Sequence, residues 1–172
     1  MSNPGSAPAR QCGEFQVCCT VFELQETNFD KPAGTPCVHL ASHGCGIHEH
    51  RPQVCRAFNC GWKQLPGLPD HLRPDLSGVL IYPVPHSMPN YLGLALIVSL
   101  SRGVAHLNDM DLMTFLLTAV TERQPVYLAV HGDRADAKGL FLNPALERPV
   151  AAQDQAGFAA VMRQAIERKM AN

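Results

Sequence analysis

Hydrophobic and polar positions divide the chain into stretches of different character. Residues 1–11 are small and polar without periodicity, which predicts a disordered leader. Residues 12–63 contain short apolar runs broken by proline, glycine and cysteine, which predicts a loop-rich region with little core of its own. Residues 64–172 hold longer, regularly spaced apolar runs, and we expect them to form the body of the protein. Three prolines within residues 64–75 indicate an irregular connector between the two.

Four stretches of the body are rich in β-branched and aliphatic residues and predict strands: residues 78–84, 92–100, 125–130 and 140–142. The first two are separated by a short loop with two prolines, which indicates a hairpin. Pro83 predicts that the first strand ends early or lies at a sheet edge, because proline cannot donate to a strand ladder. A turn is expected at His131-Gly132-Asp133.

Two helices are predicted from apolar positions at helical spacing. The first has Asn108 and Asp109 as candidate caps and runs to about Glu122, and the second runs from about Gln153 to Met170. Asp109 and Asp111 form a near pair of carboxylates, which we attribute to capping and to the helix dipole. The predicted fold class is α+β: a loop-rich, metal-stapled cysteine cluster packed as one domain on a small antiparallel sheet with two main helices.

Composition and charge narrow the class of protein. Hydrophobic residues make up 46% of the 172 residues, enough for a buried core. The net charge of −1 gives no bulk attraction to nucleic acid or an anionic membrane, so neither is expected as a partner. The first residues lack the apolar stretch of a secretory signal, and the longest apolar run, Tyr91–Leu100, is about half of the ~20 residues that span a bilayer. We therefore expect a soluble, cytoplasmic protein.

Cysteine is the most informative residue type. All seven cysteines lie within the first 60 residues, two of them adjacent: Cys12, Cys18, Cys19, Cys37, Cys45, Cys55 and Cys60. An odd count in a reducing compartment favours free thiolates over a disulfide framework. Thiolate sulfur is a preferred ligand of zinc and of iron–sulfur clusters. No pair has the C-x2-C spacing of a zinc knuckle, so the prediction of a metal centre on all seven rests on number and clustering.

Neighbouring residues support this prediction. Arg51 and Arg56 flank Cys55, and basic side chains would balance a thiolate centre and lower thiol pKa values. Four histidines fall in the same region: His39, His43, His48 and His50. A single centre is the first expectation, and two centres, with one of these histidines as a ligand, is the second. Exposure on a polar loop is the alternative for each histidine.

The residues now show a family resemblance. The segment from Cys45 to Cys60, C-G-I-H-E-H-R-P-Q-V-C-R-A-F-N-C, resembles the YkgJ-type cysteine-cluster family, described as a zinc- or iron-chelating domain. Members show a C-x2-C-x2-C-C start, a middle cysteine and a C-x-I-Y-x-x-R-P-x-x-C-R-x-F block. Cys12, Cys18 and Cys19 match the start, and Cys37 matches the middle cysteine. The resemblance covers residues 12 to about 62 and implies metal chelation.

Two positions depart from the family pattern. Phe15 stands where the opening motif has its second cysteine, which removes one expected ligand. His48 stands where the block has tyrosine and adds an imidazole. Some related cysteine clusters occur in proteins that look like lysine methylases with an iron–sulfur centre. We do not expect that activity in this chain, because no S-adenosylmethionine-binding pattern is visible in it.

The sequence therefore predicts a metal-binding protein that holds zinc or an iron–sulfur cluster, with a structural, storage or sensing role. One alternative is an iron–sulfur redox or group-transfer enzyme whose substrate is held by the C-terminal part. Another is a protein-interaction module in which zinc is only a staple. The sequence has no P-loop, G-x-G-x-x-G, G-x-S-x-G or H-E-x-x-H motif. Catalytic residues and any protein partner stay open.

Overall fold

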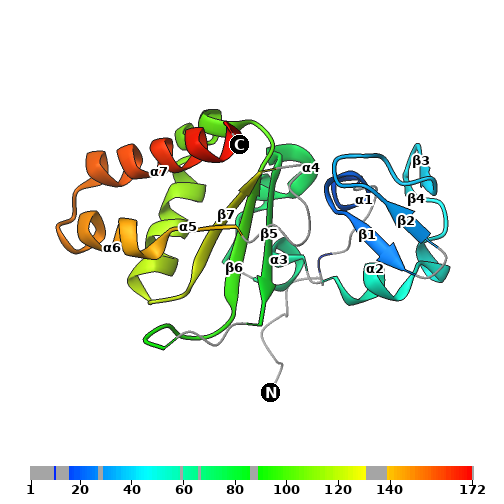
Figure 1. Cartoon of the computed structure of the whole chain (residues 1–172), viewed down its shortest axis with the longest axis horizontal. Coiled ribbons are helices and arrows are strands. Elements are labelled where there is room, and N and C mark those ends of the chain that lie inside the picture. Colours follow the sequence, from blue (N-terminus) through cyan, green and yellow to red (C-terminus); the bar gives the residue numbers. More distant parts are fainter. Residues whose placement is uncertain are drawn as a thin grey trace, which may run out of the picture.

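The computed structural model describes Arg10 and residues 16–26, 29–58, 60–65, 67–85, 89–130 and 139–171. Within these ranges the chain forms two parts that lie side by side (Figure 1). We call residues 16–58 the cysteine lobe and residues 60–171 the body. The predicted disordered leader falls outside the described residues except for Arg10, and the turn predicted at His131-Gly132-Asp133 falls outside them entirely.

The cysteine lobe consists of short elements. These are α1 (Val17–Val21), β1 (Leu24–Glu26), β2 (Phe29–Lys31), β3 (Leu40–Ala41), β4 (Gly44–Cys45), the 3₁₀ helix η1 (His48–His50) and α2 (Gln53–Ala57). β1 pairs with β2 and β3 with β4, both antiparallel. Among the lobe's described residues, only Val21 and Leu24 are buried apolar side chains. So small a core contributes little free energy to folding, so other interactions must stabilise the lobe.

The body is built on a four-stranded sheet in the order β5 (Val79–Val84), β6 (Ala95–Leu100), β7 (Val126–Val130) and β8 (Leu140–Phe141). β5 and β6 form the predicted antiparallel pair, and Pro83 lies in the edge strand β5. The prediction of an antiparallel sheet is wrong for β6 and β7, which pair in parallel. The reason is the long crossover between them, which returns the chain to the same end of the sheet.

That crossover contains the 3₁₀ helix η3 (Gly103–Asn108) and α5 (Met110–Thr121), the first predicted helix. The second is α7 (Gln155–Met170), and both are confirmed. A third helix, α6 (Asn143–Ala151), was not predicted because it contains Pro144 and Pro149. Pro144 fits the first turn, where a helix N–H has no partner within the helix. The fold is thus mixed helix and sheet, as predicted, and α6 is a long helix that the sequence did not indicate.

Helices α5, α6 and α7 lie on one side of the sheet, and the cysteine lobe lies beyond the other side (Figure 1). Between the sheet and the lobe stand α3 (Gly61–Gln64) and α4 (Pro74–Ser77), which both contact β5. The 3₁₀ helix η2 (Asp70–Leu72) lies between α3 and α4 in the chain and contacts α4. The core of the body combines strand, helix and connector residues, among them Trp62, Leu72, Val98, Leu116, Leu128, Leu146 and Ile166. No described helix is both long and apolar enough to cross a membrane.

Small and aromatic residues pack α3 and the cysteine lobe against β5. A side chain at Gly61 would place its Cβ 2.7 Å from the Ile81 carbonyl oxygen, so α3 packs closely on β5 only because this residue is glycine. The ring of Phe22 lies 4.7 Å from Phe58 within the cysteine lobe and 5.1 Å from Tyr82 of β5. These three rings join the lobe to the edge of the sheet.

Candidate metal centre

The described cysteines come from separate elements of the chain. Cys18 and Cys19 lie on α1, Cys37 lies in the turn before β3, Cys45 ends β4, Cys55 lies on α2, and Cys60 directly precedes α3. All six described cysteines are of intermediate exposure and are not in disulfides. Cys60 packs against the core of the body. Cys12, the seventh predicted ligand, lies outside the described residues.

Two hydrogen bonds connect Cys19 to other cysteines. The backbone N–H of Cys37 donates to the carbonyl of Cys19 at 2.9 Å, which fixes the turn against α1. The thiols of Cys18 and Cys19 hydrogen-bond to each other, and this bond, with burial, raises the pKa of Cys19. Neighbouring thiols resist joint ionisation because their charges repel, unless a cation replaces the proton.

Lys31, at the end of β2, is a buried charged residue of the lobe. Its side chain is only 3% exposed. The ammonium donates to the carbonyls of Thr20 at 3.1 Å, Pro32 at 3.1 Å and Thr35 at 2.7 Å. These three carbonyls accept all the hydrogen bonds that the ammonium can donate. They are neutral, however, and do not compensate its positive charge.

The groups that act on this ammonium by charge are thiols. Burial lowers the pKa of Lys31, whereas nearby thiolate charge raises it, with contributions from Cys37, Cys19, Cys55 and Cys18. Four cysteines from three separate segments therefore lie within electrostatic range of one buried cation. The structure assembles thiol groups and a counter-charge, which is the composition that a metal–thiolate centre needs.

Arg51 supplies a second cation and an unused donor. Its charge opposes the rise in the pKa of Cys19 that the Cys18 hydrogen bond and burial cause. One terminal nitrogen of its guanidinium contacts Nε2 of His48. Its Nε is buried and meets no hydrogen-bond acceptor among the described residues. A buried orphan N–H carries a free-energy cost, and N–H groups beside metal sites commonly donate to ligand sulfur.

The sulfur atoms are not at ligand spacing in this structure. Among the described residues, no three thiols have sulfur atoms that all lie within 4.8 Å of one another. Tetrahedral zinc with bonds of about 2.3 Å brings its sulfur ligands about 3.8 Å apart. Binding would therefore require these side chains to move inward, which short elements and turns permit more readily than a packed core does.

The four histidines take different positions. The backbone N–H of His39 donates to the sulfur of Cys37 at 3.4 Å, and its ring stacks on Phe29 with centroids 5.7 Å apart. His48 contacts Arg51, while His43 and His50 are exposed. His39 is thus next to the thiol group through its backbone, with its ring held by Phe29.

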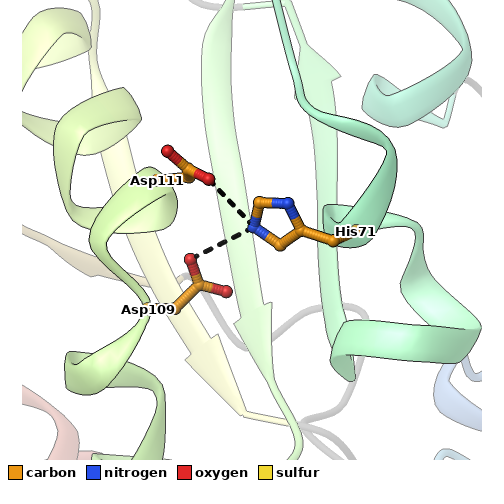
Figure 2. A group of neighbouring side chains, drawn as sticks. All are labelled: His71, Asp109 and Asp111. Atoms are coloured by element: carbon orange, nitrogen blue, oxygen red, sulfur yellow. Dashed lines mark ion pairs between the residues drawn. The ribbon is translucent and has the colours of Figure 1, made fainter.

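A different group of side chains lies on the body (Figure 2). His71 of η2 approaches Asp109 and Asp111 at the start of α5, with all three potential ligand atoms within 4.8 Å of one another. Asp109 caps α5 as predicted, because its carboxylate accepts from the N–H of Leu112 at 3.1 Å. The sequence did not indicate His71, since nothing in the local pattern pairs it with residues about 40 positions later.

No known protein family, curated protein or solved structure matches this chain. The resemblance of residues 12 to about 62 to the YkgJ-type family therefore stays a prediction from the quoted residues.

Proposed function

We propose that the cysteine lobe binds a metal centre, either zinc or an iron–sulfur cluster, as the resemblance to YkgJ-type proteins implies. Cys18, Cys19, Cys37 and Cys55 supply its first ligands. Cys12, Cys45 and Cys60 are the remaining candidates, for completing this centre or for a second one. The observation that carries the proposal is the buried ammonium of Lys31 with four thiols within electrostatic range.

The charge of Lys31 is the main support for a metal centre. A buried ammonium costs several kcal/mol unless an opposite charge compensates it, and protonated thiols provide none. Four thiolates around one zinc ion, or around a [4Fe–4S] cluster in its oxidised form, carry a net charge of roughly −2. Lys31 and Arg51 together bring +2, so the centre and its surroundings would be neutral. This charge balance is the same for zinc and for the iron–sulfur cluster, so it favours neither.

Stability is the second argument. A lobe whose described residues include only two buried apolar side chains has little hydrophobic driving force for folding. A structural zinc site contributes on the order of 10 kcal/mol to folding in small domains. The bound ion would cross-link α1, the turn at Cys37 and α2. An iron–sulfur cluster would supply electron transfer in addition.

Metal analysis of protein purified without oxygen tests the proposal. We expect either about one or two zinc ions per chain in a colourless protein, or iron and sulfide in a brown one with visible absorbance. Iron would favour the redox-enzyme alternative, whereas zinc would favour a structural or storage role. Protein that is folded throughout but contains no stoichiometric metal would refute the proposal.

Arg51→Lys tests the unused donor. This substitution keeps the positive charge but removes the buried Nε–H, and loss of such an outer hydrogen bond lowers metal affinity by about 10-fold to 100-fold. Affinity can be measured by competition with a chelator of known strength. Arg56→Lys is the matched control, because Arg56 is exposed on α2 and should leave affinity unchanged. Equal affinities for both variants would exclude a role for Arg51 beside the centre.

A further inference from the structure

His71, Asp109 and Asp111 converge from two elements that are distant in sequence (Figure 2). Nε2 of His71 lies 3.5 Å from Oδ1 of Asp109 and 3.3 Å from Oδ2 of Asp111. The side chains of His71 and Asp111 are 51% and 59% exposed, and that of Asp109 is 21% exposed. The three groups thus form an open site at the surface of the body, within reach of solutes.

These separations agree with ligation of one ion. Nitrogen and oxygen ligands lie about 2.1 Å from zinc, so two of them at a tetrahedral angle are about 3.4 Å apart. The two separations observed here, 3.3 and 3.5 Å, are close to that value. Little movement would therefore be needed for all three side chains to contact the same ion, in contrast to the thiols of the cysteine lobe.

The supporting elements hold the side chains in place. Asp109 is oriented by the hydrogen bond from the N–H of Leu112. His71 is held through its two neighbours in η2. Leu72 is buried in the core and only 2% exposed, and Asp70 forms an ion pair with Arg10 at 3.0 Å. Anchored ligands lose little conformational entropy on binding, which favours affinity.

The local charge also suits a cation. With a neutral imidazole the site carries two negative charges. Across the described parts of the chain, no lysine or arginine is ion-paired with either carboxylate, and Arg73 is paired with Asp75 instead. The site is therefore negatively charged, which favours the binding of a cation.

We propose that His71, Asp109 and Asp111 bind a divalent ion that prefers nitrogen and oxygen ligands, such as Mn²⁺, Fe²⁺ or Zn²⁺. This site is separate from the thiolate centre and does not depend on it. Three protein ligands leave coordination positions for water or for an oxygen of another molecule. Such open positions distinguish metal sites that polarise or activate a bound molecule from closed structural ones.

Mn²⁺ is the suitable probe, because thiolates are poor ligands for it and carboxylates are good ones. Free Mn²⁺ in a titration of the full-length protein can be measured by electron paramagnetic resonance. We expect saturable binding of one ion per chain, and at least about tenfold weaker binding by His71→Ala and by Asp111→Asn. Both side chains are exposed, so neither variant should unfold the body.

Glu122→Gln is the matched control, since it removes an exposed carboxylate just after α5, at the other end of that helix, and should leave the affinity unchanged. Cys19→Ser should also leave Mn²⁺ binding unchanged, which separates this site from the thiolate centre. No saturable binding by the native protein, or equal affinity of His71→Ala and the native protein, would overturn the proposal. The three groups would then be a surface contact between His71 and the two carboxylates that holds no ion.

Discussion

Cys19→Ser is expected to lower the metal affinity of the protein by about 100-fold or more and to unfold the cysteine lobe, while the body stays folded. Serine keeps the size of the side chain but replaces a thiolate with a hydroxyl that is a far weaker ligand for zinc or iron. Cys19 makes several contacts at the proposed site. Its thiol bonds to Cys18, its carbonyl accepts from the N–H of Cys37, and it lies within electrostatic range of Lys31 and Arg51.

Two measurements check this result. Metal content reports on the site, and hydrogen exchange of residues 16–58 against residues 60–171 reports on which part unfolds. Thr20→Val is the matched control, because it changes the adjacent side chain to an isostere and keeps the Thr20 carbonyl that binds Lys31. Full metal content in Cys19→Ser would remove Cys19 from the ligands. Equal loss of protection in both parts would contradict a separate folding role for the metal.

The sequence predicted most helices and strands of the body but not the direction in which its strands pair. Runs of β-branched and aliphatic residues located β5, β6, β7 and β8, helical spacing located α5 and α7, and Asp109 was a candidate cap of α5. Strand direction was not available from these patterns, because a strand alternates in the same way whichever direction its neighbour runs. The proline-containing helix α6 was missed since proline usually ends a helix.

The candidate site was predictable in part. The number and clustering of cysteines indicated the lobe, and the position of Arg51 beside Cys55 marked it as a neighbour of the site. Lys31 gave no signal, because D-K-P-A-G-T-P is typical of a solvated turn. Its burial arises from the path of the backbone, which turns three carbonyls toward one point. His71 was missed for a related reason: its partners are brought near only by the packed fold.

Lys31→Met is expected to weaken metal binding by about 100-fold, a loss of about 2.7 kcal/mol. Methionine approximates the shape of the lysine stem but has no charge, so a centre of roughly −2 would keep only Arg51 as its counter-charge. Chelator competition measures the affinity. Lys63→Met is the matched control, because Lys63 is an exposed lysine on α3 and its loss should not change metal binding.

The comparison of metal-loaded and metal-free protein decides what Lys31 does. In both forms the substitution removes the ammonium as a donor to the carbonyls of Thr20, Pro32 and Thr35. The cost is about 1 to 3 kcal/mol for each buried carbonyl that has no other donor. Only the loaded form also loses attraction between the ammonium and the thiolates, so its unfolding free energy should fall further than that of the metal-free form. Equal destabilisation of the two forms would mean that Lys31 serves only to bind carbonyls. The buried charge would then no longer be evidence for a metal centre in the cysteine lobe.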